Sequence, residues 1–321
     1  MTAESVTVPP GLTPAATSQP GPRAAQPAAR RSSGAPGEPR LVPYLYIAPA
    51  FLLFLAFVLA PLLHTVWLSF FSWDGISLGE WVGLGNYSTE LADPALRTAL
   101  THSLVFVITF CVLPVAVGLI VATILSRQQL RGLAAFRTIL FLPQVMAMVV
   151  VGVAWRWMYA DTGTVNQLLQ LVGLPAGEAW LGSFTWALPF IGLVGTWVMT
   201  GLCMVLFLAG VGNIDVELYD AARVDGAGAV REFFAVTLPG LRQELSVALT
   251  ITVIAALRSF DLVYVTTGGG PGTATIVPGT EIYRLAFRDG QVGAACAVAV
   301  LLTVVIFAVV AVITRIVGEE S

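Results

Sequence analysis

The sequence predicts an all-α polytopic membrane protein with six transmembrane helices. Of its 321 residues, 57% are hydrophobic and 11% are charged, whereas about a quarter of the residues in soluble domains are charged. The apolar residues occur in unbroken runs, and a helix needs about 20 such residues to cross a bilayer. A membrane-spanning barrel would instead show alternating segments of about 10 residues.

Six runs reach this length and are rich in Leu and Val. They cover residues 44–71, 99–126, 138–159, 186–210, 245–264 and 292–316. With their loops they predict one transmembrane domain over 41–321. Residues 1–40 are rich in Pro, Ala, Gly and Ser and offer too little apolar surface to offset the entropy of ordering, so we expect a disordered cytoplasmic tail.

The distribution of Arg predicts the orientation of the chain. Eleven Arg lie in the tail, in 127–137, in 211–243 and at position 315, and three (Arg97, Arg284 and Arg288) lie on the opposite side. Cytoplasmic loops carry an excess of basic residues. We therefore expect both termini and the 211–243 loop to be cytoplasmic, in a multi-pass protein of the cytoplasmic (inner) membrane.

The basic residues also exclude one kind of chemistry. All 16 are Arg, and a P-loop requires a Lys to reach the nucleotide phosphates, so no standard ATP site is expected here. The cysteines Cys111, Cys203 and Cys296 lie inside apolar runs, at spacings that suit neither a disulfide framework nor a metal site. We expect no catalytic residue, no metal, no cofactor and no nucleic-acid partner on this chain.

Residues 217–239 form a polar island between two apolar runs. Asp215 is a suitable N-cap and Glu217 suits the first turn, which predicts a helix over about 216–224. A break at Gly226 or Gly228 would precede a second short helix over about 229–236. Ala221 and Ala222 leave the first helix with little bulk, so a partner groove could approach its backbone.

The contacts expected for this first helix divide into two kinds. Leu218, Tyr219 and Ala222 would be buried against a partner, while Asp220 and Arg223, together with the neighbouring Asp225, would make polar contacts at the rim. An ordinary amphipathic helix at the lipid headgroups is the alternative from charge pattern alone. Such a helix has no need for a glycine and a terminal Leu-Pro at fixed distances.

The full spacing resembles the cytoplasmic coupling loop of the permease subunits of ATP-binding-cassette (ABC) importers, the EAA motif, written EAA---G---------I-LP. Asp220-Ala221-Ala222, Gly226 and Leu238-Pro239 match it, with Asp for the usual Glu and Val236 for the usual Ile. The resemblance implies contact with a partner ATPase. The implied coupling residues are Glu217, Leu218, Asp220, Ala221, Ala222, Arg223, Asp225, Gly226, Leu238 and Pro239.

Other fragments are similar to the permeases of carbohydrate importers, the branch related to the maltose and glycerol-3-phosphate permeases. They include Val82–Tyr87, Gly163–Leu169 and SFDLVYVTTGGGP over 259–271. The resemblance implies a type I ABC importer permease fold and import of a sugar or oligosaccharide by alternating access. It also implies a heterodimer with a second homologous permease, two ATPase subunits that carry ATP and Mg, and an extracytoplasmic solute-binding protein.

Two other functions stay open from the sequence. One is an ABC permease for glycerol-3-phosphate or another non-sugar solute, and the other is an ion-coupled secondary transporter. The latter predicts acidic residues near the membrane midplane, where this chain offers only Asp261, off centre.

Candidate residues for the solute path lie near the end of the fifth apolar run. Arg258 and Asp261 are three residues apart, which places them on one face of this helix. Charges inside a membrane usually face a partner or a water-filled path. Together with Tyr264 they could line the path and bind sugar hydroxyls, or the two charges could form a structural ion pair.

Overall fold

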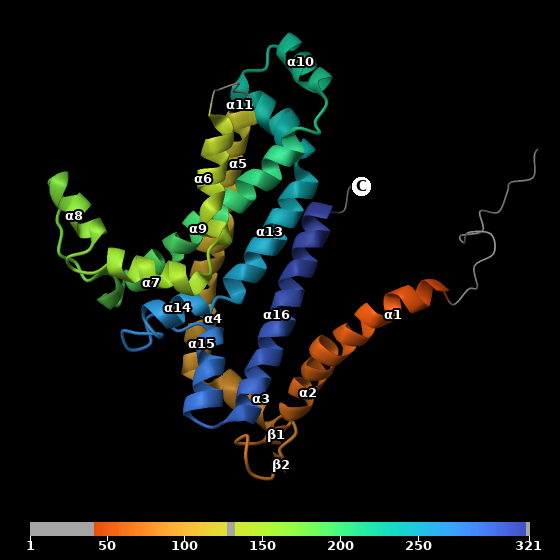
Figure 1. Cartoon of the computed structure of the whole chain (residues 1–321), viewed down its shortest axis with the longest axis vertical. Coiled ribbons are helices and arrows are strands. Elements are labelled where there is room, and N and C mark those ends of the chain that lie inside the picture. The colour runs from red at the N-terminus through yellow and green to blue at the C-terminus, as the bar shows by residue number, and fades with distance from the viewer. Residues whose placement is uncertain (1–41, 127–131, 319–321) are drawn as a thin grey trace, which may run out of the picture. The chain divides into compact units, whose positions relative to one another are not determined.

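The computed structural model describes residues 42–126 and 132–318 (Figure 1). The expected tail over 1–40 and the residues Arg127 and Arg131 lie outside these ranges. The chain divides into two compact units, Met1–Leu55 and Ala56–Ser321. The first contains helix α1 (Val42–Phe54), and the second contains the elements from α2 onward, including both candidate sites.

The N-terminal half of the second unit is helical apart from one small hairpin. Its elements in order are α2 (Ala60–Leu68), β1 (Phe71–Ser72), β2 (Glu80–Trp81), α3 (Gly85–Ala92), α4 (Pro94–Phe106), a π turn (Val107–Val112), α5 (Leu113–Ser126), α6 (Leu133–Val145), α7 (Met148–Met158), α8 (Thr164–Leu171) and a 3₁₀ turn (Trp180–Gly182). The antiparallel strands pair Phe71 with Trp81 and Ser72 with Glu80.

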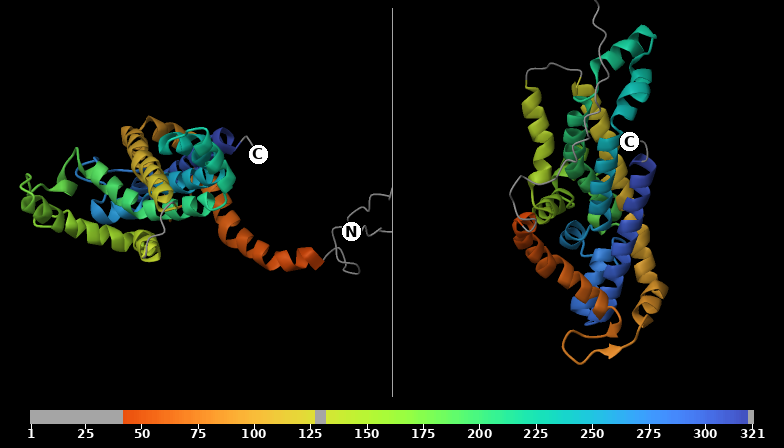
Figure 2. Two further views of the ribbon diagram at one scale, coloured as in Figure 1. Left: turned by 90° about the horizontal axis from the view of Figure 1, so that it is seen from above. Right: turned by 90° about the vertical axis from the view of Figure 1, so that its right-hand side faces the viewer.

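The C-terminal half contains the longest single helices. Its elements are α9 (Ala187–Val211), α10 (Val216–Val224), α11 (Ala229–Glu232), a π turn (Phe233–Thr237), α12 (Leu238–Gly240), α13 (Arg242–Leu257), α14 (Asp261–Thr266), α15 (Pro278–Tyr283), a π turn (Arg284–Arg288) and α16 (Val292–Gly318). In Figures 1 and 2, α10 and α11 lie at the opposite end of this unit from β1 and β2.

The structure has up to six membrane spans, the number predicted from the sequence, if each of two bent helix pairs is counted as one span. Within the described ranges, Tyr44–Leu68, Pro94–Ser126, Ala187–Val211 and Val292–Val317 are long and apolar enough to cross a membrane. Two further pairs pass the same test together, although each is bent. The pair Leu133–Val145 and Met148–Met158 bends by 100°, and the pair Ala229–Gly240 and Arg242–Leu257 bends by 73°.

The bend between α6 and α7 corrects the expected continuous helix over 138–159. Pro143 removes a backbone donor near the end of α6, and Met146 and Ala147 then adopt extended backbone conformations. The two halves pack on different neighbours. Gly201 of α9 lies directly against the backbone of α6 at Leu140, whereas α7 packs against α14.

Helix α9 forms the centre of the second unit and packs against α5, α6 and α13. Small residues permit this close approach, as is common between membrane helices. A Cβ added at Gly118 of α5 would lie 2.6 Å from the Cβ of Cys203. Around α9, a buried apolar cluster includes Phe106, Phe110 and Leu262, so the centre of this unit holds the end of α13 and the start of α14 in place.

Candidate functional site

Helix α10 forms where the sequence predicts it. Asp215 adopts an extended conformation, and its Oδ1 accepts a hydrogen bond from the Glu217 backbone N at 3.1 Å. Glu217 lies in the first turn and Arg223 in the last, so both charges complement the helix dipole. The predicted helix over about 216–224 is therefore confirmed.

One face of α10 points away from the rest of the chain. Leu218 is 55% exposed and Val224 is 88% exposed, and Ala221 between them is also exposed. Their spacing of three residues places them on one side of a helix. The carboxylates of Glu217 and Asp225 lie beside them, so the outward face is apolar at its centre and acidic at its rim.

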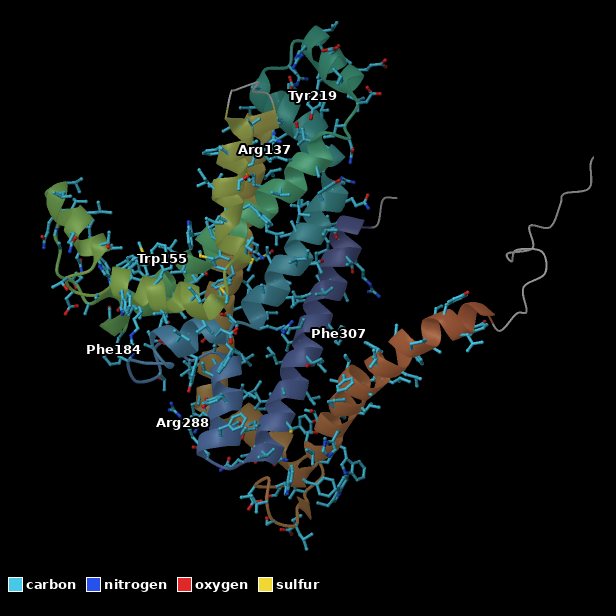
Figure 3. All side chains as sticks on the ribbon, viewed as in Figure 1. Arg137, Trp155, Phe184, Tyr219, Arg288 and Phe307 are labelled. Carbon is cyan, nitrogen blue, oxygen red and sulfur yellow. The ribbon has the colours of Figure 1, made fainter. Side chains whose placement is uncertain are left out.

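The opposite face of α10 packs on this chain itself. The side chain of Tyr219 is labelled in Figure 3. Its hydroxyl lies 3.3 Å from the Thr237 hydroxyl. Arg223 Nε lies 3.4 Å from Oε2 of the buried Glu232, and its Nη1 donates to Asp220 Oδ1 at 3.2 Å. The half-buried Ala222 lies beside Tyr219. Tyr219 and Arg223 thus contact residues of this chain, while the Arg223 side chain stays largely exposed.

Gly226 produces the break after α10. Its φ is +74°, in the left-handed region, and a Cβ there would meet no atom within 4 Å. Glycine is thus required by the backbone conformation and not by space. The Gly226 N–H donates to Arg223 O at 3.0 Å and the Ala227 N–H to Ala222 O at 2.9 Å, which satisfies the last carbonyls of α10.

Leu238 and Pro239 lie inside a helix that continues to Gly240, so the expected second helix over 229–236 is too short. The π turn over Phe233–Thr237 explains why the proline is tolerated. The Leu238 N–H there bonds to Phe233 O, five residues back, which widens the helix immediately before Pro239. The chain bends only at Leu241, which is fully buried.

The second candidate site lies at a break in the fifth span. Helix α13 ends at Leu257, and α14 starts at Asp261, so the expected continuous helix over 245–264 is wrong. The segment that begins α15 packs here, since a Cβ at Gly279 would lie 2.9 Å from the Cβ of Phe260. Arg258 and Asp261 consequently share no helix face, and no ion pair joins them among the described residues.

Arg258 and Asp261 nevertheless line one cavity of about 180 Å³. Its other walls include Phe110 of the π turn after α4, Met148 at the start of α7 and Phe260 of the break. The bend between α6 and α7 therefore contributes to the same cavity as the break between α13 and α14.

Tyr264 belongs to an aromatic group beside this cavity. Its ring stacks on Phe260 at a centroid distance of 5.1 Å, and its hydroxyl lies 3.2 Å from that of Tyr283. The sequence analysis did not identify Phe260 or Tyr283 as site residues. Phe260 stands between the two candidate charges and could have been inferred from them, whereas Tyr283 comes from α15 and only the fold brings it there.

The comparisons with known proteins agree with this architecture. Residues 115–319 match the family described as "Binding-protein-dependent transport system inner membrane component". This range runs from α5 to the end of α16 and contains both candidate sites. The chain is 37% identical over 273 residues to YurN of Bacillus subtilis, named as a probable ABC transporter permease protein, covering 84% of this chain and 93% of that protein.

Two further proteins extend the likeness. The arabinooligosaccharides transport system permease protein AraP of Halalkalibacterium halodurans is 32% identical over 279 residues, covering 84% of this chain and 85% of AraP. A chain of a bacterial ABC transporter involved in the import of the acidic polysaccharide alginate has a similar fold. Its TM-score is 0.74 at 23% identity, covering 87% of this chain and 95% of that chain. The chain therefore belongs to the family of binding-protein-dependent transport system inner membrane components, the permease subunits of ABC transporters.

Proposed function

We propose that the chain is the permease subunit of an ABC importer that moves a carbohydrate, a sugar or an oligosaccharide, across the cytoplasmic membrane by alternating access. The observation that carries this proposal is the coupling segment. Its helix α10 presents an unpartnered apolar and acidic face, and its opposite face is fastened to the helix that leads into α13.

The proposal includes the partners and the orientation. This chain is non-catalytic and acts with a second homologous permease and an extracytoplasmic solute-binding protein. Two ATPase subunits bind ATP and Mg, and this chain holds no cofactor of its own. The coupling segment 211–243 and both termini face the cytoplasm, in keeping with the excess of Arg on that side.

The geometry offers a path from the ATPase to the cavity. A movement of α10 passes to residues 229–240 through the Tyr219–Thr237 contact and the Arg223–Glu232 ion pair. These residues join α13 at Leu241, and the far end of α13 carries Arg258 at the cavity wall. Alternating access is then an equilibrium between two arrangements that ligands on both sides of the membrane shift.

The solute path that we assign consists of Arg258, Asp261 and Tyr264, to which the structure adds Phe260 and Tyr283 as neighbours. Aromatic faces stack on sugar rings, and the guanidinium and carboxylate can donate to and accept from sugar hydroxyls. The substrates named for AraP and for the alginate transporter are both carbohydrates, which supports this class.

The alternative within the family is a permease for glycerol-3-phosphate or another non-sugar solute. An ion-coupled secondary transporter is less well supported, because it has no use for the exposed face of α10. Uptake of radiolabelled sugars and of glycerol-3-phosphate into vesicles that contain the assembled transporter distinguishes these functions. Uptake driven by an ion gradient without ATP would overturn the proposal.

The coupling role has its own test. Leu218→Glu adds a charge at the centre of the outward face of α10, and burying it against an ATPase is unfavourable. We expect co-purification of the ATPase to fall by about tenfold or more. The matched control is Val172→Glu, where a similarly exposed apolar residue lies outside the coupling segment. Normal ATPase binding and uptake with Leu218→Glu would exclude α10 as the coupling helix.

The orientation is tested with fused reporters. A reporter placed after Arg231 should report the cytoplasm, and reporters after Asp93 and Glu178 should report the exterior. A cytoplasmic signal after Asp93 would contradict the assignment.

A further inference from the structure

A polar cavity of about 310 Å³ lies between the loop of the β1–β2 hairpin, α3 and the start of α16. It is at the end of the second unit opposite to α10 (Figure 1). It shares no residue with the coupling segment or with the cavity beside Arg258. No basic side chain lines it within residues 42–126 and 132–318, whereas Asp74 and Glu90 both do.

Glu90 contributes a buried carboxylate to this cavity. Its side chain is 4% exposed, and its Oε2 is buried without a hydrogen-bond partner. The nearby Arg284 does not compensate it, because that guanidinium pairs with Glu281 and Asp289. Burial raises the pKa of Glu90. A cation beside the carboxylate would favour its charged form and remove the cost of leaving it unpaired.

Two further oxygen atoms are available as acceptors in the walls. Asn86 donates through Nδ2 to the backbone oxygens of Ser69 at 2.8 Å and Phe71 at 2.9 Å. Its amide oxygen receives no hydrogen bond from a described residue. Asp74 Oδ1 accepts three hydrogen bonds from within its own loop, which leaves its Oδ2 as the free carboxylate oxygen.

The three segments that carry these oxygens are held together by backbone contacts. The Gly293 N–H at the start of α16 donates to Trp73 O of the hairpin loop at 3.1 Å. A Cβ at Gly75 of the same loop would lie 3.2 Å from a methyl carbon of Val292. The hydrogen bonds from Asn86 fasten α3 to the start of the hairpin. The acceptors are therefore positioned before any ligand binds, which lowers the entropy lost on binding.

The kind of donor decides which cation would fit. No three His, Cys, Asp or Glu side chains gather as a metal site in the described part of the chain, which argues against a transition metal. Carboxylate, amide and water oxygens together suit Ca²⁺, which accepts six to eight oxygen ligands in flexible geometry. Mg²⁺ requires a near-ideal octahedron. The cavity also has room for several waters at about 30 Å³ each.

We propose that this cavity binds Ca²⁺ through the carboxylates of Glu90 and Asp74 and the amide oxygen of Asn86, with water completing the coordination. In the orientation of the proposed function, on which this step rests, the site faces the exterior. With only two carboxylates, we expect the affinity of extracellular modules, a Kd of about 10⁻⁴–10⁻³ M. The ion would join the hairpin loop to α3 at the outer end of the permease.

The first measurement is the Tm of the assembled transporter in neutral detergent, in millimolar Ca²⁺ and in EGTA. Ca²⁺ should raise the Tm in a concentration-dependent manner. Glu90→Gln should abolish this difference between the two buffers, although in EGTA the same variant removes an uncompensated buried charge. The control Glu80→Gln, an exposed carboxylate of the same hairpin outside the cavity, should retain the difference.

The second measurement detects the ion directly. Tb³⁺ replaces Ca²⁺ in oxygen sites and emits light when a nearby Trp is excited, and Trp73 lines this cavity. We expect emission that Ca²⁺ displaces. Trp73→Phe should lose most of the emission but keep the rise in Tm with Ca²⁺. Asp74→Asn removes the charge but leaves Oδ1 as an acceptor, and it should weaken Ca²⁺ binding about tenfold. This variant carries the test if Glu90→Gln does not assemble.

Three results would overturn the proposal. One is an equal rise in Tm with Mg²⁺ or with Na⁺ at the same ionic strength, which would indicate general screening. Another is an unchanged rise with Ca²⁺ in both Glu90→Gln and Asp74→Asn. The third is Tb³⁺ emission that persists in Trp73→Phe. The measurements need neither ATP nor a solute, so a failure of the carbohydrate assignment leaves them unchanged. A wrong orientation would show in the reporter after Asp93 and not in Ca²⁺ binding.

Discussion

The coupling segment and the break at residues 258–260 both interrupt helices, but they do so for different reasons. In the coupling segment, the interruption is local: Gly226 adopts a left-handed conformation in open space. At the second break, no glycine or proline occurs, and the α15 segment packs against Phe260 instead. The conformation of Gly226 alone accounts for the first break. The second break depends on packing against Gly279, which is about 20 positions away in the sequence.

The largest effect on uptake is expected at Gly226, where the cause of the break is local. Gly226→Val forces a β-branched residue to a φ of +74°, at a cost of about 1–2 kcal/mol. The helix over 229–240 would then leave α10 in a different direction. We expect uptake to be abolished while the chain still inserts in the membrane.

Gly228 provides the matched control for this substitution. Its φ is −72°, and a Cβ there also meets nothing within 4 Å. Gly228→Val should retain most uptake. Equal loss in both variants would mean that added bulk, and not backbone conformation, is the cause, and the contrast between the two breaks would fail.

At the second break, the prediction concerns solute contact. Asp261→Asn should reduce uptake by about tenfold, since a hydrogen bond to a charged group contributes about 1.5–3 kcal/mol. Assembly and ATP hydrolysis should be retained. The control Asp161→Asn changes an exposed carboxylate outside this cavity. If Asp261→Asn prevents assembly, its role is to hold the break together and not to contact the solute.

A smaller effect on uptake is expected at the ion pair between Arg223 of α10 and Glu232 of the following helix. Arg223→Ala leaves the buried carboxylate of Glu232 without this ion pair. Because the Arg223 side chain is largely exposed, we expect a loss of about threefold in uptake per ATP hydrolysed. Arg223→Lys should recover part of it. Asp289→Ala, which removes the ion pair with Arg284 outside the coupling segment, is the control, and an equal loss there would exclude a role for the Arg223–Glu232 pair.

The smallest effect on transport is expected outside both regions, at Glu90 of α3. Glu90 is buried, and one of its carboxylate oxygens has no hydrogen-bond partner. Burial raises the pKa of Glu90, with further contributions from Asp93 and Glu281. A raised carboxyl pKa means that the folded state favours the proton, so this contribution to stability is present at low pH and lost as the pH rises through the raised pKa.

Glu90→Gln should therefore raise the Tm at about pH 7 and have a diminishing effect toward about pH 4. Thermal unfolding of the purified chain at several pH values checks this, with the exposed Glu80→Gln as the control. Uptake should be unchanged. A lower Tm at neutral pH would contradict the sign of the effect.

Much of the fold could be predicted from the sequence because its signals are local. Apolar run length predicts the spans, and Asp215, Glu217 and Gly226 predict the ends of α10. The bend after Pro143 also had a local signal, since proline removes a backbone donor, but its angle depends on how α6 packs on α9.

The cavity beside Arg258, which we propose as part of the solute path, could be predicted only in part. Arg258, Asp261 and Tyr264 are close in sequence and lie beside one cavity. Phe110, Met148 and Tyr283 come from three other segments, and no local pattern indicates that they meet. Likewise, which face of α10 is free depends on Thr237 and Glu232, which fix the orientation of the helix from a distance.

The bend at Leu241 separates two helical segments of different length. At 1.5 Å per residue, the arm over 229–240 is roughly 18 Å long and α13 is roughly 24 Å long. Leu241 is fully buried between them and packs with Phe207 and Ala248, which makes it a natural pivot. If the two arms rotate together about it, a displacement of about 3 Å at the coupling end becomes about 4 Å at Arg258. Such a displacement is comparable with the width of a hydroxyl group and its hydrogen bond, the scale on which the proposed sugar ligand would be held or released.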